Sequence, residues 1–301
     1  MKNSVVLSIL LTVILAFNGF PQQVPAPAQN EAVTITGATA HIGDGSIIEN
    51  CSLVFEGGKI TALGSEVTSK GTIINAVGKH LYPGFIAPGK SLGLIEVNAV
   101  RASNDQDEIG LLIPHVRSII AYNAESKVVE SMRPNGVLLG QVTPKGGRIS
   151  GTSSIVQFDA WNWEDAAVKL DDGIHLNWPM FLKQGNVSHG ESKGYHPDKD
   201  YAKNTAEIES FMKHSLAYGK VEPREINPAF AAMQGVFDGS QNLYVYAHGE
   251  REIIDAVTAL KKAGVKNLVL VGGYQSYKIT DFLMDNNIPV LVEFTHSLPV
   301  F

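Results

Sequence analysis

Two patterns of hydrophobic and polar positions divide the chain. Over residues 32–80 apolar and polar residues alternate, as in "AVTITGATAHIGDG" and "IIENCSLVFEGGKITALG", and glycine-rich turn sequences separate the runs. Alternation with a period of two over short runs is typical of β-strands that bury one face. The pattern predicts a small antiparallel β module over residues 32–80.

From residue 81 onward, short apolar runs alternate with helical patterns. The expected strands lie at residues 136–142, 153–159, 243–247, 267–273 and 288–294. Short buried strands that alternate with helices indicate βαβ units and a parallel sheet, either as a barrel or as an open sheet.

The clearest helix is predicted over residues 250–263. Its apolar residues recur on one face, glutamates lie in its first turn, lysines lie in its last turn, and Gly264 follows. These charges suit the helix dipole, and glycine suits the end of a helix. A second helix is expected over residues 205–218, and "WNWEDAAVKL" is expected to start a third at Asn162.

The N-terminus has the pattern of a secretory signal. Lys2 precedes an apolar run over residues 5–17, which is too short to cross a bilayer as a helix, and a Pro/Ala/Gln-rich segment follows. We expect a signal peptide over residues 1–23, a linker over 24–31, and a secreted or periplasmic protein with no membrane contact after cleavage. The alternatives are a buried N-terminal strand and a membrane anchor.

Composition narrows the classes of function. The chain has 301 residues, 44% of them hydrophobic and 18% charged, with a formal net charge of -6. An acidic chain without runs of lysine and arginine is a poor candidate for binding nucleic acid. Cys51 is the single cysteine, so the sequence excludes an intrachain disulfide and a cysteine-based zinc cluster.

The segment "GFIAPGKS", residues 84–91, matches the spacing of a phosphate-binding loop. Such a loop directs successive backbone N–H groups at the phosphates from the start of a helix. Pro88 has no N–H to donate, Phe85 and Ile86 are typical of a strand, and "SLGLIEV" is a poor start for a helix. A P-loop NTPase therefore stays a remote alternative.

A family resemblance accounts for the same segment better. "TGATAHIGDGSIIENCSLVFEGGKITALG" followed by "GKHLYPGFIAPGKSLGL" resembles the start of an amidohydrolase-superfamily protein of the imidazolonepropionase-like branch, and the likeness continues through "VYAHGEREIIDAV" and "LVLVGGYQSYKITDF". The resemblance implies an α/β fold. It would be a (β/α)8 TIM barrel of metal-dependent hydrolase type over residues 81–301 with a small β-sandwich segment over 32–80.

The resemblance also implies where metal ligands would stand. Members of the family hold one or two divalent metals at the carboxyl ends of the barrel strands and activate a water to attack a C–N bond. The His-x-His pair falls on Gly89 and Ser91, the fifth-strand histidine on Tyr246, the sixth-strand histidine on Tyr274, and the first-strand aspartate on Ala87. The eighth-strand aspartate has no counterpart, and the barrel is expected to end near strand seven. No metal site of the family type is expected.

A pocket or a relocated metal site remains open. The candidate residues are Lys90, Glu96, Asp159, Tyr246, His248, Tyr274, Glu293 and His296. His248 follows Tyr246 by two residues, so the two side chains can point the same way from a strand. The simpler interpretation is that the tyrosines fill the vacated pocket, the histidines form hydrogen bonds at strand ends, and Lys90 is solvated. Several aromatic residues, Trp178 among them, are scattered along the chain. Two interpretations are open for them: packing in the core, or lining a groove for a sugar or peptide.

These observations lead to two hypotheses. The first is an exported amidohydrolase-family protein without the usual metal ligands. It would have no cofactor and would act as a non-catalytic binding or scaffold partner of an intact relative or as a homo-oligomer. The second is a working hydrolase of non-peptide or cyclic amides with a relocated site for zinc or another divalent metal. The small-molecule ligand is not readable from the sequence.

Overall fold

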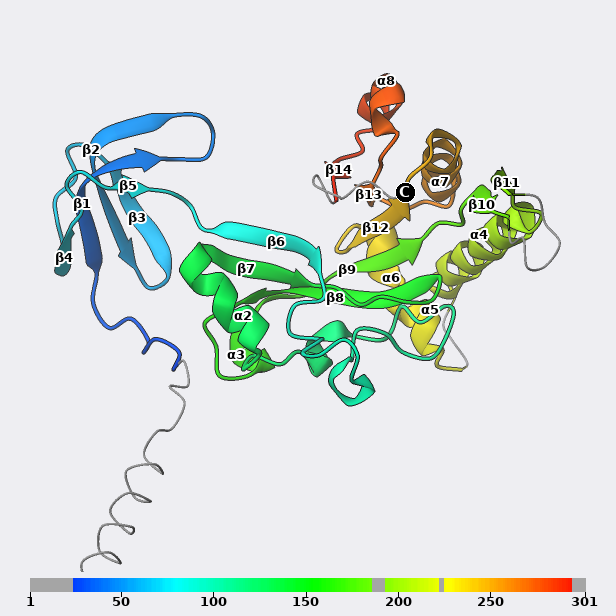
Figure 1. Cartoon of the computed structure of the whole chain (residues 1–301), viewed down its shortest axis with the longest axis horizontal. Helices are drawn as coiled ribbons and strands as arrows, with labels where there is room; N and C mark the ends of the chain where they lie inside the picture. The colour runs from blue at the N-terminus through cyan, green and yellow to red at the C-terminus, as the bar shows by residue number, and fades with distance from the viewer. Residues whose placement is uncertain (1–23, 186–192, 222–224, 294–301) are drawn as a thin grey trace, which may run out of the picture. The chain divides into compact units, whose positions relative to one another are not determined.

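The computed structural model describes residues 24–185, 193–221 and 225–293 (Figure 1). The predicted signal peptide and His296 lie outside the described residues. The chain forms two compact units, one up to Pro83 and one from Gly84 onward. Within the described ranges no helix is long and apolar enough to cross a membrane.

The N-terminal unit is a five-stranded sheet. Its strands are β1 (Val33–His41), β2 (Ile47–Glu56), β3 (Lys59–Gly64), β4 (Thr72–Asn75) and β5 (His80–Leu81). They lie in the order β3-β2-β1-β4, and β5 also pairs with β1.

The prediction of an antiparallel module is confirmed for the hairpins of β1, β2 and β3 and is wrong for β4 and β5, which run parallel to β1. Between β3 and β4 the chain runs back to the end of the sheet where β1 begins, so β4 can pair with β1 in parallel. The buried Thr34 hydroxyl holds this return, because it donates to the Lys70 carbonyl and accepts from the Lys70 N–H. Cys51 is free and buried in this unit.

The second unit contains a seven-stranded sheet. Its strands are β6 (Phe85–Lys90), β7 (Val137–Val142), β8 (Ile149–Gln157), β9 (Ala167–Asn177), β12 (Asn242–Ala247), β13 (Asn267–Gly272) and β14 (Val290–Leu291). The order is β14-β13-β12-β9-β8-β7-β6. A side chain starting at Gly89 on β6 would lie 3.9 Å from Glu293 Oε1, just after β14, so the two ends of the sheet approach each other as in a nearly closed barrel.

One strand breaks the parallel pattern. β8 is antiparallel to both β7 and β9, whereas the remaining pairs are parallel. The connection from β7 to β8 is a short hairpin over residues 143–148, which leaves no room for a crossover helix. The sheet is therefore mixed. The carboxyl ends of the other six strands lie at one end of the sheet, and the amino end of β8 lies at that same end.

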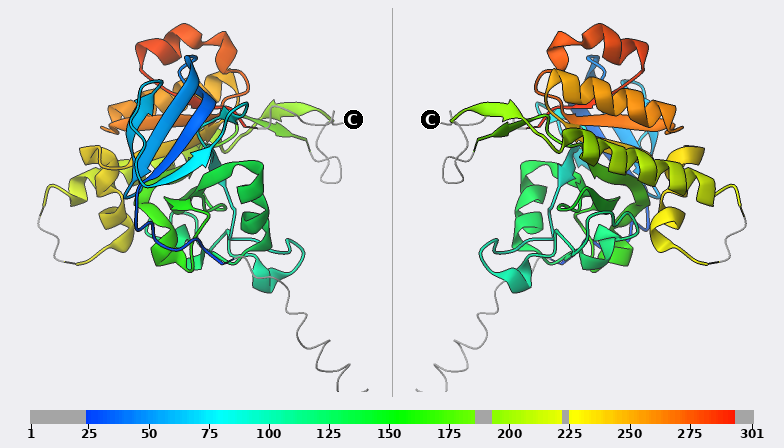
Figure 2. Two further views of the ribbon diagram at one scale, coloured as in Figure 1. Left: turned by 90° about the vertical axis from the view of Figure 1, so that its left-hand side faces the viewer. Right: turned by 90° about the vertical axis from the view of Figure 1, so that its right-hand side faces the viewer.

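Helices cover the outer face of the second half of this sheet. They are α4 (Tyr201–Tyr218), α5 (Pro228–Ala232), α6 (Gln234–Asp238), α7 (Glu250–Lys262) and α8 (Thr280–Asp285). Another helix, α2 (Lys127–Met132), precedes β7. A two-stranded ribbon of β10 (Leu182–Gln184) and β11 (Tyr195–Pro197) follows β9. Figure 2 shows α4 and α7 running side by side. Both predicted helices are confirmed, with α4 starting four residues earlier than expected.

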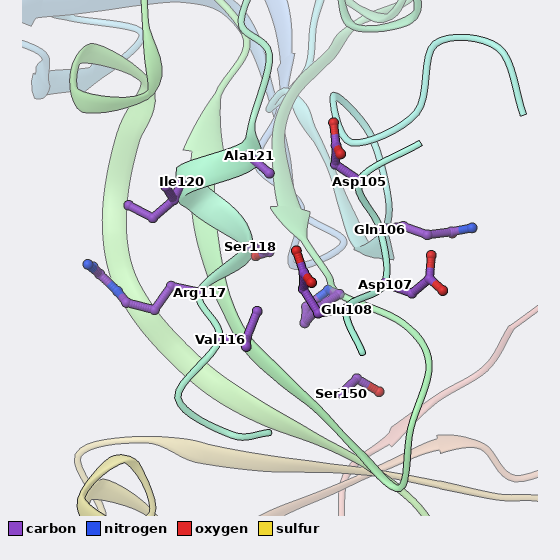
Figure 3. A pocket seen from close by; sticks show the side chains of 11 residues that line it. Asp105, Gln106, Asp107, Glu108, Val116, Arg117, Ser118, Ile120, Ala121 and Ser150 are labelled. Carbon is purple, nitrogen blue, oxygen red and sulfur yellow. The ribbon is translucent and has the colours of Figure 1, made fainter. Parts of the chain in front are cut away.

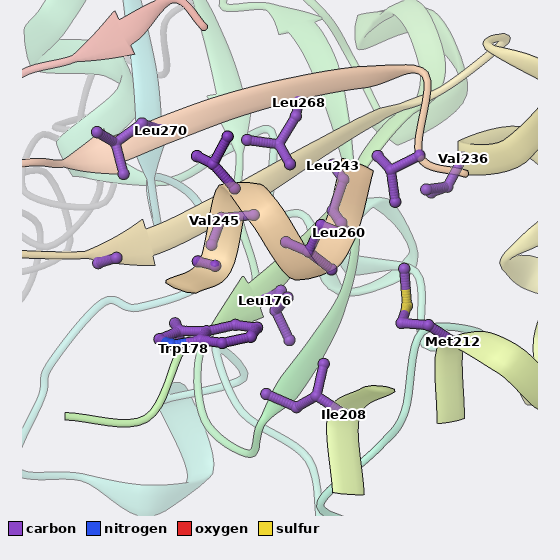
Figure 4. Packing of buried hydrophobic residues seen from close by; sticks show 14 of the residues in the cluster. Leu176, Trp178, Ile208, Met212, Val236, Leu243, Val245, Leu260, Leu268 and Leu270 are labelled. Carbon is purple, nitrogen blue, oxygen red and sulfur yellow. The ribbon is translucent and has the colours of Figure 1, made fainter. Parts of the chain in front are cut away.

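The core lies between these helices and the strands (Figure 4). Leu243 and Val245 of β12 are buried against Ile253 and Leu260 of α7 and Met212 of α4. The intervening β12 residues, Tyr244 and Tyr246, belong to the opposite face. The outer face of the sheet is thus apolar, and its inner face carries polar side chains.

The helix predicted at "WNWEDAAVKL" is wrong beyond its first turn. α3 spans only Trp163–Ala166, where the Asn162 side chain accepts the Asp165 N–H at 2.8 Å. Val168 and Leu170 already belong to β9, because this segment pairs with β8 before β9 also pairs with β12 from Gly173 onward. The sequence patterns did not predict β9, and this strand carries the centre of the candidate site.

Candidate functional site

The inner face of the sheet carries a buried polar cluster. Its members are Gln141 of β7, Ser153 of β8, Lys169, Asp172 and His175 of β9, and Tyr244 and Tyr246 of β12. Most of these side chains are buried, whereas Lys169 is half exposed and Tyr246 is partly exposed. Barrel interiors are usually filled by branched apolar residues. Polar side chains in this position are stable only if each of them finds a hydrogen-bond partner.

His175 lies at the centre of the cluster. Its Nε2 atom is 2.8 Å from Ser153 Oγ and its Nδ1 atom is 3.1 Å from Tyr246 Oη. Burial lowers the pKa of His175 to about 3, with Asp172 opposing the shift and Lys145 adding to it. The imidazole is therefore neutral at physiological pH.

The partners define the tautomer of His175. The Ser153 hydroxyl donates to the Gly173 carbonyl at 3.1 Å, so Ser153 Oγ accepts from the His175 Nε2–H. The Nδ1 atom then accepts from the Tyr246 hydroxyl. Burial and the nearby Glu293 carboxylate both raise the pKa of Tyr246, which keeps its phenol protonated as this hydrogen bond requires.

Gln141 joins β6 to this cluster. Its Oε1 atom accepts the Gly89 N–H at 3.0 Å, and its Nε2 atom donates to Ser153 Oγ at 3.2 Å and to Asp172 Oδ2 at 3.1 Å. Gly89 has a φ of 64°. That left-handed conformation favours glycine and directs the N–H inward.

Asp172 is the charged group of the cluster. Lys169 Nζ donates to Oδ1 at 2.8 Å, and Tyr244 Oη donates to Oδ2 at 2.6 Å. Burial opposes ionisation, but the hydrogen bonds from Lys169, Tyr244 and Gln141 outweigh it and hold the pKa of Asp172 below its ordinary value. Each polar group of the cluster thus has its hydrogen-bond partner, which is the condition for a stable buried network.

The Ser153–His175 pair has the spacing of a nucleophile and its base but cannot act as one. Ser153 is fully buried, and its proton is donated to a backbone carbonyl. A nucleophile needs access to substrate and a base that takes its proton. The arrangement is structural.

The residues at the expected metal-ligand positions do not fit a divalent cation. Gly89 has no side-chain donor, the Ser91 hydroxyl donates to Gln106 Oε1 at 3.3 Å, and Tyr246 is a protonated phenol that binds His175. Tyr274 is exposed after β13 and stacks on His248, with ring centroids 4.7 Å apart. Within the described ranges no group of three His, Cys, Asp or Glu side chains is arranged to hold a metal.

The structure brings together only some of the relocated-site candidates. His248 meets Tyr274, and Glu293 lies near Tyr246 and Gly89. Glu96 is exposed in the loop after β6, where it accepts a hydrogen bond from Asn123. Lys90 ends β6, and its carbonyl accepts the Thr143 N–H.

Asp159 lies at the opposite end of the sheet from His248. It follows β8, whose last residues pair with the start of β7, and it forms an ion pair with Arg133 at 2.7 Å. A metal site that joins Asp159 and His248 is excluded by this geometry. The antiparallel direction of β8 is the reason, and no pattern in the sequence indicated it.

The P-loop alternative is wrong. Residues 85–90 form a strand, and residues 91–100 form turns and an isolated bridge without a helix. The Gly89 N–H, which a phosphate would need, donates to Gln141.

Two cavities lie in the second unit, and one of them is lined in part by Tyr246 of the polar cluster. One of about 320 Å³ is lined by Asp105, Asp107 and Glu108 together with Arg117. In Figure 3 the Arg117 side chain lies apart from the acidic ones, and its Nε atom pairs with Asp171 at 2.7 Å. The other, of about 380 Å³, lies at the carboxyl ends of β9 and β12.

Sequence patterns missed six residues of the cluster: Gln141, Ser153, Lys169, Asp172, His175 and Tyr244. One signal was present for His175, a single polar residue between Ile174 and Leu176 in the buried second half of β9. A polar residue in such a strand must find buried partners. Without the position of β9, those partners were not identifiable.

Comparison with known proteins supports the fold. No protein-family model matches the sequence, and no curated protein matches it. Among solved structures, an amidohydrolase from Thermotoga maritima MSB8 is similar, with a TM-score of 0.74 and 20% identity over 87% of this chain and 70% of that chain. A prolidase in complex with N-methylphosphonate-L-proline aligns over 87% of this chain and 66% of that chain, with a TM-score of 0.45 and 11% identity. The chain therefore has the barrel-like fold of an amidohydrolase.

Proposed function

We propose that this protein is an exported, amidohydrolase-like protein that works as a non-catalytic binding or scaffold partner. One observation carries the proposal. Tyr246, at the position where the family resemblance puts a metal-binding histidine, is a protonated phenol that donates to the buried, neutral His175.

The fold shared with the Thermotoga amidohydrolase supports the broader assignment. We propose further that the chain derives from the imidazolonepropionase-like branch. In this view its seven-stranded sheet corresponds to strands of a (β/α)8 barrel and its N-terminal sheet to one layer of the accompanying sandwich. Export rests on the signal pattern of residues 1–23.

The chemistry of the cluster supports loss of hydrolysis. Metal-dependent hydrolysis needs a cation that generates hydroxide and a nearby carboxylate or imidazole that moves a proton. Asp172 is ionised, but Lys169, Tyr244 and Gln141 occupy its oxygens. Both nitrogens of His175 are likewise occupied. A network with all its donors and acceptors paired holds the interior rigid and leaves no group free for proton transfer.

The exposed residues of β6 support a role in association. β6 is the last strand of the sheet order, and its side chains Phe85 and Ile86 are 67% and 58% exposed. Neighbouring apolar side chains that are exposed in this way form a surface against which another chain can pack. The partner would be an intact amidohydrolase relative or a second copy of this chain.

The alternative is a hydrolase of C–N bonds with zinc at a relocated site around His248. The carboxylate that contacts the His248 backbone is Glu252, but its oxygens accept the backbone N–H groups of Phe181, His248 and Gly249. A metal would have to displace these hydrogen bonds. The geometry therefore favours the non-catalytic protein.

The test is metal content combined with turnover. The protein is purified without chelator, its folding is verified by circular dichroism, and bound metal is measured by mass spectrometry before and after dialysis. Hydrolysis of N-acyl amino acids and cyclic amides is then measured with and without added zinc. We expect no retained metal and no turnover. One equivalent of metal that survives dialysis and is lost in His248→Ala but not in the exposed control His115→Ala would overturn the proposal.

A further inference from the structure

Two histidines of the N-terminal unit lie side by side on the open face of its sheet. His41 ends β1 and His80 begins β5, and these strands pair in parallel with Thr39 opposite His80. Side chains alternate between the two faces of a strand, so Thr39, His41 and His80 share one face. Ala38 and Ala40, which alternate with Thr39 and His41, are 1% and 3% exposed and lie on the buried face.

The two imidazoles meet through their ring nitrogens. His41 Nε2 is 3.0 Å from His80 Nδ1, and this hydrogen bond is exposed to solvent. The His80 side chain is exposed and that of His41 is partly exposed. Because water competes for such a bond, a ligand that binds both nitrogens can reach them and replace it.

The distance between the two nitrogens fits adjacent ligands of one metal ion. Imidazole nitrogens bind divalent transition metals at about 2.0–2.1 Å. Two such bonds at a right angle place the nitrogens about 2.9 Å apart, and a tetrahedral angle places them about 3.3 Å apart. The observed 3.0 Å is closer to the right angle, which is typical of copper(II) and nickel(II) in square or tetragonal sites.

Tyr82 holds the plane of the His41 ring. The two rings are stacked, with centroids 4.3 Å apart and planes 9° apart, and Tyr82 is 60% exposed. Stacking leaves the ring nitrogens at the edge open and reduces the freedom that His41 loses on binding. The His80 ring is tilted by 36° against His41. Its χ2 torsion has a broad minimum, so a rotation can direct its lone pair to the same point as that of His41.

Both facing nitrogens must be without a proton before they can bind a metal. In the hydrogen-bonded pair one of them carries the shared proton, and that imidazole becomes a ligand by moving the proton to its other ring nitrogen through water. Across the described residues no three His, Cys, Asp or Glu side chains are arranged around a metal, so water would complete the coordination. Such a site is open and exchanges its ion with solvent.

We propose that His41 Nε2 and His80 Nδ1 bind a divalent transition-metal ion, with copper(II) preferred. Copper(II) has the highest affinity for nitrogen ligands among the divalent first-row metals, and its geometry matches the separation of the two nitrogens. The bound ion would fasten the end of β1 to β5. The site belongs to the N-terminal unit and goes beyond the non-catalytic function proposed for the barrel-like sheet.

The experiment titrates the full protein with copper(II), nickel(II) and zinc separately, in the presence of glycine as a weak competing chelator. Calorimetry gives the affinity and the number of ions bound, and electron paramagnetic resonance of the copper sample gives the geometry and the nitrogen ligands. We expect one copper ion in a tetragonal site with two imidazole nitrogens, and weaker binding of nickel and zinc.

Two variants remove one ligand each. His41→Phe keeps a ring for stacking on Tyr82, and His80→Gln keeps a polar side chain on the open face. Each should weaken copper binding by at least about a hundredfold, because the second imidazole acts at a high effective concentration. The exposed control His115→Gln should leave the affinity unchanged. Circular dichroism verifies the fold of every variant.

Each outcome decides the proposal. Absence of a bound copper ion, or equal copper affinity in the wild type and His41→Phe, would overturn it. Loss of affinity in only one of the two variants would also overturn it, because a single histidine would then hold the ion. Zinc that binds more tightly than copper would overturn the preference for copper.

The same titrations separate this site from the proposed function. His248→Ala should leave copper binding unchanged, because His248 belongs to the second unit. Dialysis should remove copper from an open site with two protein ligands, so the site does not add to the retained metal that tests the non-catalytic function. Copper binding that His248→Ala abolishes and His41→Phe preserves would overturn the site on the N-terminal sheet.

Discussion

The phenol of Tyr246 and the imidazole of His175 share a 3.1 Å hydrogen bond between Oη and Nδ1 inside the sheet. The two residues come from neighbouring parallel strands, β12 and β9. Tyr246 stands where the family resemblance puts a metal-binding histidine. Its hydrogen-bond partner His175 is neutral at neutral pH, because burial lowers its pKa to about 3. The hydrogen bond therefore joins two neighbouring strands inside the barrel-like sheet.

The first prediction concerns Tyr246→Phe. Removing the phenol oxygen leaves His175 Nδ1 buried without a donor, because its other nitrogen is already bound to Ser153. We expect the free energy of unfolding to fall by about 1–3 kcal/mol. Urea denaturation followed by circular dichroism measures it, with the 71% exposed Tyr277→Phe as the control. Equal midpoints for the two variants would contradict the network.

The second prediction concerns the pH dependence of stability. His175 has a pKa of about 3 in the folded protein against 6.5 for an ordinary histidine. Below the ordinary value the unfolded chain takes up a proton that the folded protein does not. The free energy of unfolding should therefore fall, by up to about 1.4 kcal/mol per pH unit, as the pH drops from 6.5 toward 3.

Urea midpoints between pH 5 and pH 7 measure this contribution in a range where carboxylates contribute little. The slope should be smaller in His175→Gln than in the wild type and unchanged in the exposed control His115→Gln. A wild-type slope that His175→Gln leaves intact would assign the effect to other groups.

The third prediction concerns Gln141→Glu. The new carboxylate would lie beside Asp172, since Gln141 Nε2 is 3.1 Å from Asp172 Oδ2. Two buried carboxylates at this distance share a proton, so the folded state binds one proton more than the unfolded state near neutral pH. Stability should therefore be lost as the pH rises, by about 3 kcal/mol or more at pH 7.5 and by less at pH 5.

Gln141→Met is the matched comparison, because it removes the same hydrogen bonds and adds no charge. Its destabilisation should not depend on pH between 5 and 7.5. If the free energies of unfolding of Gln141→Glu and Gln141→Met changed equally with pH, the result would contradict an ionised Asp172 in the folded protein.

The fourth prediction concerns Glu252→Ala. Three backbone N–H groups lose their acceptor, and the link between Phe181 and the start of α7 is broken. We expect a loss of about 2–4 kcal/mol, more than the about 1 kcal/mol typical of a single helix cap. The exposed Glu250→Ala in the same helical turn is the control. A difference between the two variants below 0.5 kcal/mol, roughly the scatter of surface substitutions, would argue against this role.

Much of the fold followed from local patterns. β12, β13 and α7 were predicted nearly residue by residue, because each combines a clear apolar period with helix or strand boundaries that depend only on neighbouring residues. Gly89 and Tyr246, at positions where the family resemblance puts metal ligands, were also singled out from the sequence. These features depend on residue type and spacing alone.

The candidate site itself was decided by the tertiary structure. β9 was missed because its polar residues, Asp172 and His175, obscure the apolar alternation that marks a strand, and only pairing with β8 and β12 compensates for them. The reversed direction of β8 separated Asp159 from His248 in the same way. Buried polar groups are stable only through partners that are distant in sequence, such as Tyr246 for His175 at 71 residues. The sequence alone therefore determined which local elements form and which residue types stand at the positions compared with the family, whereas the polar network and the cavity beside it exist only once those strands are brought together.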